Sequence, residues 1–525
     1  MSSKKKNMIT LVVLSILLVI CLLLYFFLPK GQGNDTGDKS DTETIKVDTI
    51  TADKIQSMSF EKNGKKVWSL THKKDNWKFA EDDSIPVNTE KITAITDLLN
   101  PLEATKTIDS AENVADYGLA MPTMTLTVTA TDGREYQYQI GTKVPKEDMG
   151  YYVKSNAGKQ IYCVKDLIDS IDIERNLLIQ MDSLPEIKTD YMTYIQVDNR
   201  KGKDFEAKKV SDKEKVDFYS NWNITKPYDK PLATSSMDWT TTLGYFNALS
   251  YTQLVDYDTK TLAKYGLDNP SSVITVKYYE AEDGYTPTVT ATPSSTTTGN
   301  SSSEKSYVIP ESKRVYKTLK LCVGDKTKGG YYVCEYGKKN VYKMDIEVIE
   351  NMTKLDAYKS MDHCVYSVLA TSIDGYDVTY GNTTLKVTRQ AIEEKSDSSP
   401  TATPDGETGT AVENAANKNQ KNIWTLNGKT IDEKDENDFL TPYSTAYLLE
   451  YSEKAEGDNV KPKSNKPVLT IVYHEEKRDV TVKYLPYDGT NFYRVDKNGM
   501  DYFLVDKLQV DDIIEKFKGI EKLAK

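Results

Sequence analysis

Cys322 and Cys334 are the side chains whose type and spacing allow the clearest chemistry in this sequence, which is a disulfide. The segment 319–336 is typical of a β-hairpin, because alternating apolar residues flank a turn that contains glycines. Pairing Val323 with Val333 places Cys322 opposite Cys334, at a Cα separation of about 4.5–5.5 Å that a disulfide tolerates. The alternative is a pair of small, half-buried thiols, so the pattern predicts the register and leaves the disulfide open.

Other groups that carry chemistry do not form a recognisable constellation. The sequence contains no Gly-x-Ser-x-Gly elbow, phosphate-binding loop or His-Glu-x-x-His motif. The histidines, at positions 72, 363 and 474, are isolated, whereas metal ligands come in clusters. The acidic pairs Asp82-Asp83 and Asp511-Asp512 are explained by a solvated surface or by the charge preferred at a helix start. We therefore expect no catalytic residue, no cofactor site and no metal site.

Composition limits the class of protein. The chain has 525 residues with 68 Lys and Arg against 79 Asp and Glu, which gives a net charge of −11. A nucleic-acid-binding protein would need a basic face, so we expect no nucleic-acid partner. The 36 tyrosines indicate a structure rich in β-strands.

The N-terminal segment predicts a membrane anchor. Met8–Leu28 carries no charge and is long enough, as a helix, to cross about 30 Å of hydrocarbon. Lysines precede it at residues 4–6, and the chain beyond is polar and acidic, so the positive-inside rule places the N-terminus in the cytoplasm. A cleaved signal peptide is the alternative, but the run is longer than usual and lacks a small-x-small site. We expect a single-pass protein of the cell membrane, with tip and anchor at 1–30, a flexible stalk at 31–45 and the bulk extracytoplasmic.

One pattern occurs twice in the same order and a third time in degenerate form. It consists of a Trp, a Tyr-Gly-Leu followed by a Pro, a strand that ends in Ile-Gly or Val-Gly, and a Tyr-Tyr-Val strand. The residues that define it are Trp77, Tyr117, Gly118, Leu119, Pro122, Gly141 and Tyr152, then Trp222, Tyr265, Gly266, Leu267, Pro270, Gly324 and Tyr332, and finally Trp424, Pro467 and Tyr493. Recurrence at matched positions favours packing residues of a repeated core over a ligand platform.

The pattern predicts an α+β fold of three repeated units, each an antiparallel sheet with a covering helix. In the first unit, Asn88 or Thr89 caps a helix with an apolar stripe. The corresponding helices are expected at about 237–249 and 437–451. The predicted units are 46–186, 187–362 with a low-complexity insertion at 286–305, and 363–525 with an insertion at 395–420.

The membrane helix together with the Tyr-Gly-Leu-x-x-Pro, Ile-Gly and Tyr-Tyr-Val motifs resembles the domain-of-unknown-function 4340 family. The resemblance is best over residues 55–185, with a second copy over 190–360. It implies an auxiliary protein of an ABC-type transport system of the gliding-motility kind, with the permease subunits as partners. The family carries no established catalytic residues that could be transferred. The two insertions and the degenerate third copy depart from its pattern.

These observations favour a non-enzymatic, membrane-anchored accessory or scaffold protein on the extracytoplasmic side. The alternative is a cell-envelope or carbohydrate-binding surface protein that stacks sugars on Tyr-rich strands, and exposed rows of aromatic side chains would favour it. An exported hydrolase is a third hypothesis, which requires carboxylates that converge in a pocket.

Overall fold

The computed structural model describes most of the chain beyond the predicted anchor, which lies outside the described residues together with residues 31–44 of the stalk. The described residues are 45–74, 76–109, 113–247, 249–286, 288–290, 306–393, 420–455, 464–488 and 490–524. Over these ranges, the structure contains no helix that is long and apolar enough to cross a membrane. The two predicted insertions also fall largely outside the described residues.

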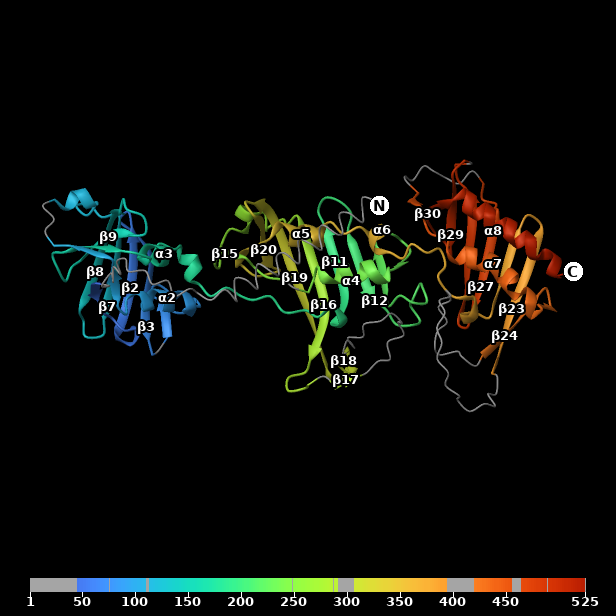
Figure 1. Cartoon of the computed structure of the whole chain (residues 1–525), viewed down its shortest axis with the longest axis horizontal. Coiled ribbons are helices and arrows are strands. Elements are labelled where there is room, and N and C mark those ends of the chain that lie inside the picture. Colours follow the sequence, from blue (N-terminus) through green and yellow to red (C-terminus); the bar gives the residue numbers. More distant parts are fainter. Residues whose placement is uncertain are drawn as a thin grey trace, which may run out of the picture. The chain divides into compact units, whose positions relative to one another are not determined.

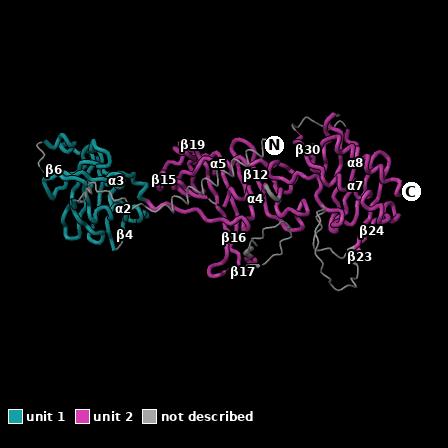
Figure 2. The backbone as a smooth tube through the Cα atoms, viewed as in Figure 1, with its two compact units in different colours: residues 1–178 teal, residues 179–525 magenta. Residues whose placement is uncertain are grey.

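The fold is α+β, as predicted, and its sheets are built from antiparallel strand pairs (Figure 1). The chain divides into two compact units, Met1–Leu178 and Ile179–Lys525 (Figure 2). One large sheet forms the centre of the first unit, and the second unit contains two further large sheets.

The first unit contains a sheet of eight strands. In spatial order these are β4 (Asn76–Phe79), β3 (Lys65–Lys73), β2 (Ile55–Lys62), β7 (Met124–Ala130), β8 (Glu135–Lys143), β9 (Tyr151–Ser155), β10 (Ile161–Val164) and β6 (Lys106–Ile108). Strand β1 (Ile45–Asp48) pairs separately with β5 (Leu102–Ala104). The helices are α2 (Thr89–Leu98) and α3 (Leu167–Ile171). Asn88 caps α2 as predicted, since its side chain accepts a hydrogen bond from the Lys91 backbone N–H.

The second sheet has nine strands and begins the second unit. In spatial order these are β14 (Leu232–Ala233), β13 (Trp222–Lys226), β12 (Phe205–Lys209), β11 (Met192–Asn199), β16 (Ser272–Ala281), β19 (Arg314–Thr327), β20 (Gly330–Glu335), β21 (Val341–Met344) and β15 (Gln253–Asp256). Strands β17 (Thr288–Thr290) and β18 (Ser306–Val308) pair antiparallel in a separate two-stranded sheet. The helices are α4 (Ser236–Gly244), α5 (Ile346–Thr353) and α6 (Ala357–Ser360). Helix α4 ends five residues earlier than predicted, at a glycine, which is a poor helix former.

The third sheet also has nine strands. In spatial order these are β25 (Lys429–Thr430), β24 (Gln420–Leu426), β23 (Thr383–Glu393), β22 (Gly375–Tyr380), β27 (Leu469–Glu475), β28 (Arg478–Pro486), β29 (Phe492–Lys497), β30 (Met500–Asp506) and β26 (Glu453–Lys454). Its helices, α7 (Glu436–Tyr447) and α8 (Lys507–Ile520), lie side by side over one face (Figure 1). The buried side of α8 consists of Val510, Ile513, Phe517 and Ile520, at helical spacing.

The three large sheets share one order of strands. In each, four strands that follow one another (β7–β10, then β16 with β19–β21, then β27–β30) are flanked on one side by the earlier strands, three in the first sheet and four in the others. A short strand, β6, β15 or β26, forms the opposite edge. Strand β7 shows why one face is buried, because Met124, Leu126, Val128 and Ala130 alternate with more exposed threonines. Pro122, Pro270 and Pro467 each lie two residues before the first residue of the equivalent strands β7, β16 and β27.

The glycine of the Ile-Gly and Val-Gly motifs leaves space for the Tyr-Gly-Leu turn. A Cβ atom on Gly141 would lie 2.0 Å from the Tyr117 carbonyl oxygen, and one on Gly324 would lie 2.1 Å from the Tyr265 carbonyl oxygen. The strand pairing shifts register at the same place in both copies, beside Ile140 in β8 and beside Val323 in β19. A β-bulge therefore brings the turn against the sheet, and only a residue without a side chain fits beneath it.

The same motif also fixes its tyrosines. The rings of Tyr117 and Tyr152 meet edge to face at 4.9 Å, and those of Tyr265 and Tyr332 do so at 5.0 Å. Gly118 and Gly266 end the preceding turns with φ values of 69° and 68°, which favour glycine. Leu119 and Leu267 are buried. The repeated residues are thus a local packing unit between a 3₁₀ turn and two strands.

The third sheet departs from this arrangement. Leu485 occupies the position of Gly141 and Gly324, and β28 pairs with β29 continuously from Val482 to Pro486. Tyr493 corresponds to Tyr331, because each donates a hydrogen bond to a carboxylate on the helix above, Asp511 at 2.8 Å and Glu350 at 3.1 Å. The first two sheets have both the strand glycine and the Tyr-Gly-Leu turn. The third sheet has neither.

Substitution of Gly324 by Ala should destabilise the second unit by about 1–3 kcal/mol, because the new methyl group would overlap a backbone carbonyl that the bulge holds in place. The measurement is urea unfolding followed by circular dichroism. Gly244→Ala is the matched control, since that position has open space and a helical backbone, where Ala is favoured. Equal stability of the Gly324→Ala variant and the unsubstituted protein would contradict the close contact.

Candidate functional site at the junction of the second and third sheets

A short extended segment, residues 361–365, connects the second and third sheets through the backbone. On one side, the Asp362 N–H donates to the Ala233 carbonyl at 2.9 Å, and Thr234 forms a bridge with Met361. On the other side, the Val365 N–H donates to the Leu449 carbonyl at 3.0 Å, next to a bridge between Cys364 and Glu450. This segment therefore hydrogen-bonds at once to β14 of the second sheet and to the loop that follows α7 beside the third sheet, and it is shared by both sides of the junction.

Phe503 of β30 is the hydrophobic centre of the junction. It is completely buried, and its ring lies 5.6 Å from that of Tyr228, 5.5 Å from that of Tyr358 and 5.0 Å from that of Tyr451. Tyr228 and Tyr358 come from the second sheet's connections, whereas Tyr451 follows α7 of the third. The ring of the neighbouring Tyr502 lies 4.7 Å from that of Tyr228, tilted by 33°. Aromatic burial from both sides thus joins the sheets.

A buried carboxylate, Asp217, lies on the other side of the junction. Its side chain is only 4% exposed and belongs to the loop between β12 and β13. It accepts hydrogen bonds from the Ser367 hydroxyl at 3.2 Å and the Tyr219 N–H at 3.0 Å, and it lies 3.9 Å from the Lys497 ammonium of the third sheet. Lys497 is itself 13% exposed, so the pair is largely removed from water.

Arg478 extends this polar contact. Its guanidinium donates to the carbonyls of Lys215 and Val216 in the same loop, and to the Glu475 carboxylate at 2.8 Å. Glu475 in turn accepts from the Tyr366 hydroxyl at 3.1 Å. The guanidinium of a third-sheet residue therefore holds the loop of the second sheet by its backbone.

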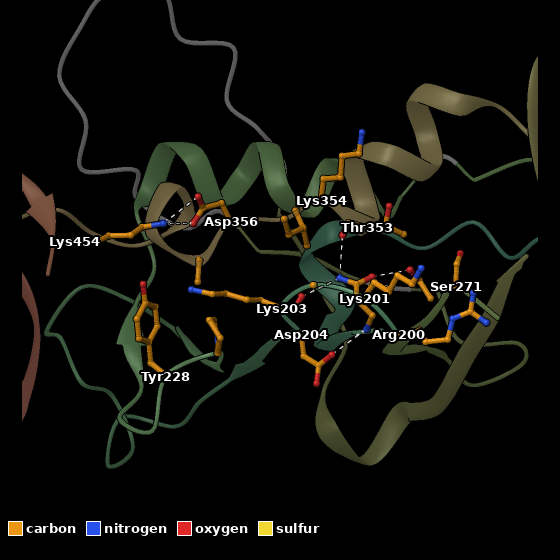
Figure 3. A pocket seen from close by; sticks show the side chains of 16 residues that line it. Arg200, Lys201, Lys203, Asp204, Tyr228, Ser271, Thr353, Lys354, Asp356 and Lys454 are labelled. Atoms are coloured by element: carbon orange, nitrogen blue, oxygen red, sulfur yellow. Dashed lines mark hydrogen bonds and ion pairs between the residues drawn. The ribbon is translucent and has the colours of Figure 1, made fainter. Parts of the chain in front are cut away.

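A cleft of about 620 Å³ lies beside the junction (Figure 3). The turn between β11 and β12, the linker between α5 and α6, Tyr228 and Lys454 form its walls. Lys454 and Asp356 pair across it at 2.9 Å, and they join β26 of the third sheet to the second. The polar groups that line it are ammonium, guanidinium, hydroxyl, amide and carboxylate groups.

The sequence-derived motif residues belong to their own sheets and differ in burial, and one of them, Trp222, lines a cavity at the junction together with Asp217 and Asp362. Trp222 and Trp424 are 5% and 2% exposed and pack against Trp239 and Phe439 of the covering helices. Trp77 occupies the equivalent place on β4 but is only half-buried, and its ring stacks on His72 at 4.8 Å. The fully buried tryptophan of the first sheet is instead Trp68, whose indole N–H donates to the Ile171 carbonyl.

The predicted hairpin register is confirmed, because Val323 pairs with Val333 and Cys322 pairs with Cys334. Both cysteines are buried free thiols in the structure. A hydrogen bond from Cys334 lowers the pKa of the Cys322 thiol. The corresponding pair in the first sheet is Gln139 with Lys154, which cannot form a bridge. The disulfide itself stays a prediction.

The tyrosines on which the sugar-binding alternative depends are buried or half-buried, with few strongly exposed among the described residues. The largest fully buried side chains include Tyr138, Tyr366, Tyr376, Tyr473 and Tyr484. The tyrosines with large exposure are at positions 219, 316 and 336. Many of the tyrosines thus fill the cores of the sheets.

The three histidines have different contact partners, and none of these partners is another histidine. His363 lies against the Tyr358 ring at 4.6 Å, and His474 accepts or donates a hydrogen bond with Asp479 at 2.9 Å. Within the described ranges, no three His, Cys, Asp or Glu side chains gather as a metal site would require.

Comparison with protein families gives one matching family model. The family model described as a domain of unknown function, DUF4340, matches residues 77–243 and again residues 222–423. Because these matches cover more than half of the chain, the protein belongs to the DUF4340 family. Each match begins at a repeated tryptophan, Trp77 or Trp222, and the second ends directly before Trp424. Comparison with curated proteins and with solved structures gave no match.

The junction residues were not singled out from the sequence. Asp217, Lys497 and Phe503 come from separate loops and strands, and each has an ordinary local context. The one usable signal is the run of aromatic residues around Asp217, from Phe218 to Trp222, which is unusual for a surface loop.

Asp217→Ala should lower the free energy of unfolding of the second unit by about 3 kcal/mol, because it leaves Lys497 largely buried without its counter-charge. Urea unfolding measures the change. Glu433→Ala is the control, since Glu433 pairs with Lys421 at the surface, where its side chain is 80% exposed, and its loss should have no measurable effect. Equal effects of the two substitutions would rule out a stabilising role for the Asp217 contact.

Proposed function

We propose that this protein is a non-enzymatic accessory or scaffold protein of the cell membrane. Residues 8–28 anchor it in the bilayer, the N-terminus is cytoplasmic and the folded units are extracytoplasmic. The observation that carries the scaffold role is the junction, where Phe503, Asp217 and the shared segment 361–365 join two sheets into one body. Two sheets joined into one body suit a protein that positions others.

We infer further that the chain consists of an anchor and three copies of one unit, 46–186, 187–362 and 363–525. The common order of strands in the three large sheets supports this division. The Gly324 and Gly141 contacts support a shared origin of the first two units. Repetition multiplies similar surfaces along one chain, which is useful for contacts with several subunits of an assembly.

The association with an ABC-type transport system is part of the proposal. Its support is the resemblance of the repeated motifs to the DUF4340 family, which implies an auxiliary protein of such a system. Permease subunits are the proposed partners, because they share the membrane with the anchor. The buried tyrosines favour this proposal over the sugar-binding alternative, which requires exposed rings.

The full chain, expressed together with the ATPase and permease subunits of an ABC-type transporter from the same organism, should remain in carbonate-washed membranes and co-migrate with the permease on a native gel. The apolar segment cannot be extracted by carbonate if it spans the bilayer. A variant that lacks residues 1–30 is the control and should be recovered in the soluble fraction.

Two results would contradict the proposal. A full chain recovered as a soluble product that starts near residue 30 would disprove the anchor. A permease that assembles equally well in cells without this protein would disprove the accessory role.

A further inference from the structure

We propose that the cleft beside the junction binds a ligand that carries a phosphate group. The cleft measures about 620 Å³, which is within the usual size of sites for small molecules (Figure 3). It lies wholly within the second unit. The inference goes beyond the accessory role and does not depend on it.

The charge of the cleft points to an anion. Its lining contains five basic side chains, Arg200, Lys201, Lys203, Lys354 and Lys454, against two carboxylates, Asp204 and Asp356. The whole chain carries a net charge of −11, so this local excess of positive charge runs against the background. A concave surface with one sign of charge concentrates counter-ions of the other sign.

The two carboxylates are already engaged. Asp356 is paired with Lys454 at 2.9 Å, and Asp204 accepts the Asn199 N–H at 2.9 Å and lies 3.8 Å from Lys226. The negative charges of Asp356 and Asp204 are therefore balanced by Lys454 and Lys226, and not by Lys201 or Lys203.

Lys201 and Lys203 are the cations that a ligand can use. Both are exposed on the β11–β12 turn, and neither has an ion-pair partner in the part of the chain that the structure describes. Lys354 is held by Glu350 at 2.7 Å. In Figure 3, Lys203 extends toward Tyr228 and the pair of Asp356 with Lys454.

Tyr228 supplies a neutral donor at the same end of the cleft. Burial, followed by the nearby Asp356 carboxylate, raises the pKa of Tyr228 to about 12, so its hydroxyl stays protonated at neutral pH. This hydroxyl has no hydrogen-bond partner among the described residues. An oxyanion can accept from the Tyr228 hydroxyl and from the lysine ammonium groups together.

The turn that carries the lysines is held in place. The Asn199 amide donates to the Lys203 carbonyl at 2.9 Å and to the Thr353 carbonyl at 3.1 Å, and its oxygen accepts from the Ser272 hydroxyl at 2.6 Å. The turn is thereby fixed to the end of α5 and to the start of β16. A prearranged site loses less conformational freedom when a ligand binds.

The donors fit a phosphate better than a carboxylate. A planar carboxylate is best matched by the fork of an arginine, but the Arg200 guanidinium donates to the Asn269 carbonyl at 2.7 Å. The remaining donors are separate ammonium and hydroxyl groups, which can approach the oxygens of a tetrahedral anion from different directions. The phosphate can belong to a soluble molecule or to a lipid headgroup, since both present the same oxygens.

The test is calorimetric titration of the full chain in a non-ionic detergent with three probes: inorganic pyrophosphate, short-chain dihexanoyl phosphatidic acid and citrate. We expect saturable binding of at least one phosphate probe, and at least tenfold weaker binding by the Lys201→Ala/Lys203→Ala variant. The matched control is Lys65→Ala/Lys66→Ala, because these exposed lysines lie at the equivalent β2–β3 turn of the first sheet. Its affinity should stay within twofold of the unsubstituted protein.

The probes separate the sources of the phosphate. Binding of pyrophosphate identifies a soluble phosphate as sufficient, and binding of phosphatidic acid alone identifies a lipid headgroup. The proposal is overturned if neither phosphate probe binds, if citrate binds as tightly, or if the control variant loses as much affinity as the Lys201→Ala/Lys203→Ala variant.

Discussion

The contact of Phe503 with tyrosines from two different sheets is the interaction on which the second unit depends. Each sheet already has its own core and covering helices, so nothing in their strands requires them to associate. The ring of Phe503 removes a shared apolar surface from water, and Asp217 and Arg478 then fix the orientation through directional contacts. Hydrophobic burial supplies most of the free energy, whereas the polar contacts determine the geometry.

The cleft is a consequence of that junction. Its lysine-bearing turn and Tyr228 belong to the second sheet, but Lys454 comes from β26 of the third. Without the Phe503 contact, Lys454 would not be held near Asp356, and Tyr228 would lose the rings that partly bury it. Structure and proposed binding are thus coupled through the same few residues.

Local features were predictable from the sequence because they depend on neighbours along the chain. Asn88 caps its helix, and the Cys322–Cys334 register follows from strand alternation across a short turn. The partial exposure of Trp77 was not predictable in the same way. Trp68 on the adjacent strand, and not Trp77, fills the core of that sheet. The repeated pattern identifies Trp77, Trp222 and Trp424 as equivalent residues. It does not show that a nearby residue outside the pattern, such as Trp68, can be buried instead.

The junction and the cleft could not be predicted for a different reason. Asp217 and Lys497 are far apart in sequence: Asp217 lies in the loop between β12 and β13, whereas Lys497 is the last residue of β29. The lysines at 201 and 203 look like an ordinary polar turn, and only the approach of the α5–α6 linker gives them a cavity. Long-range packing decides such sites, and one sequence carries no direct record of it.

Native-state hydrogen exchange tests the central claim, that the second and third sheets form one cooperative body. Amides in β16 and β27 should report the same free energy of opening for their slowest-exchanging positions, and Phe503→Ala should lower both together. Independent sheets would give different opening free energies, and Phe503→Ala would then affect the third sheet alone. That second result would contradict the account of a single rigid scaffold.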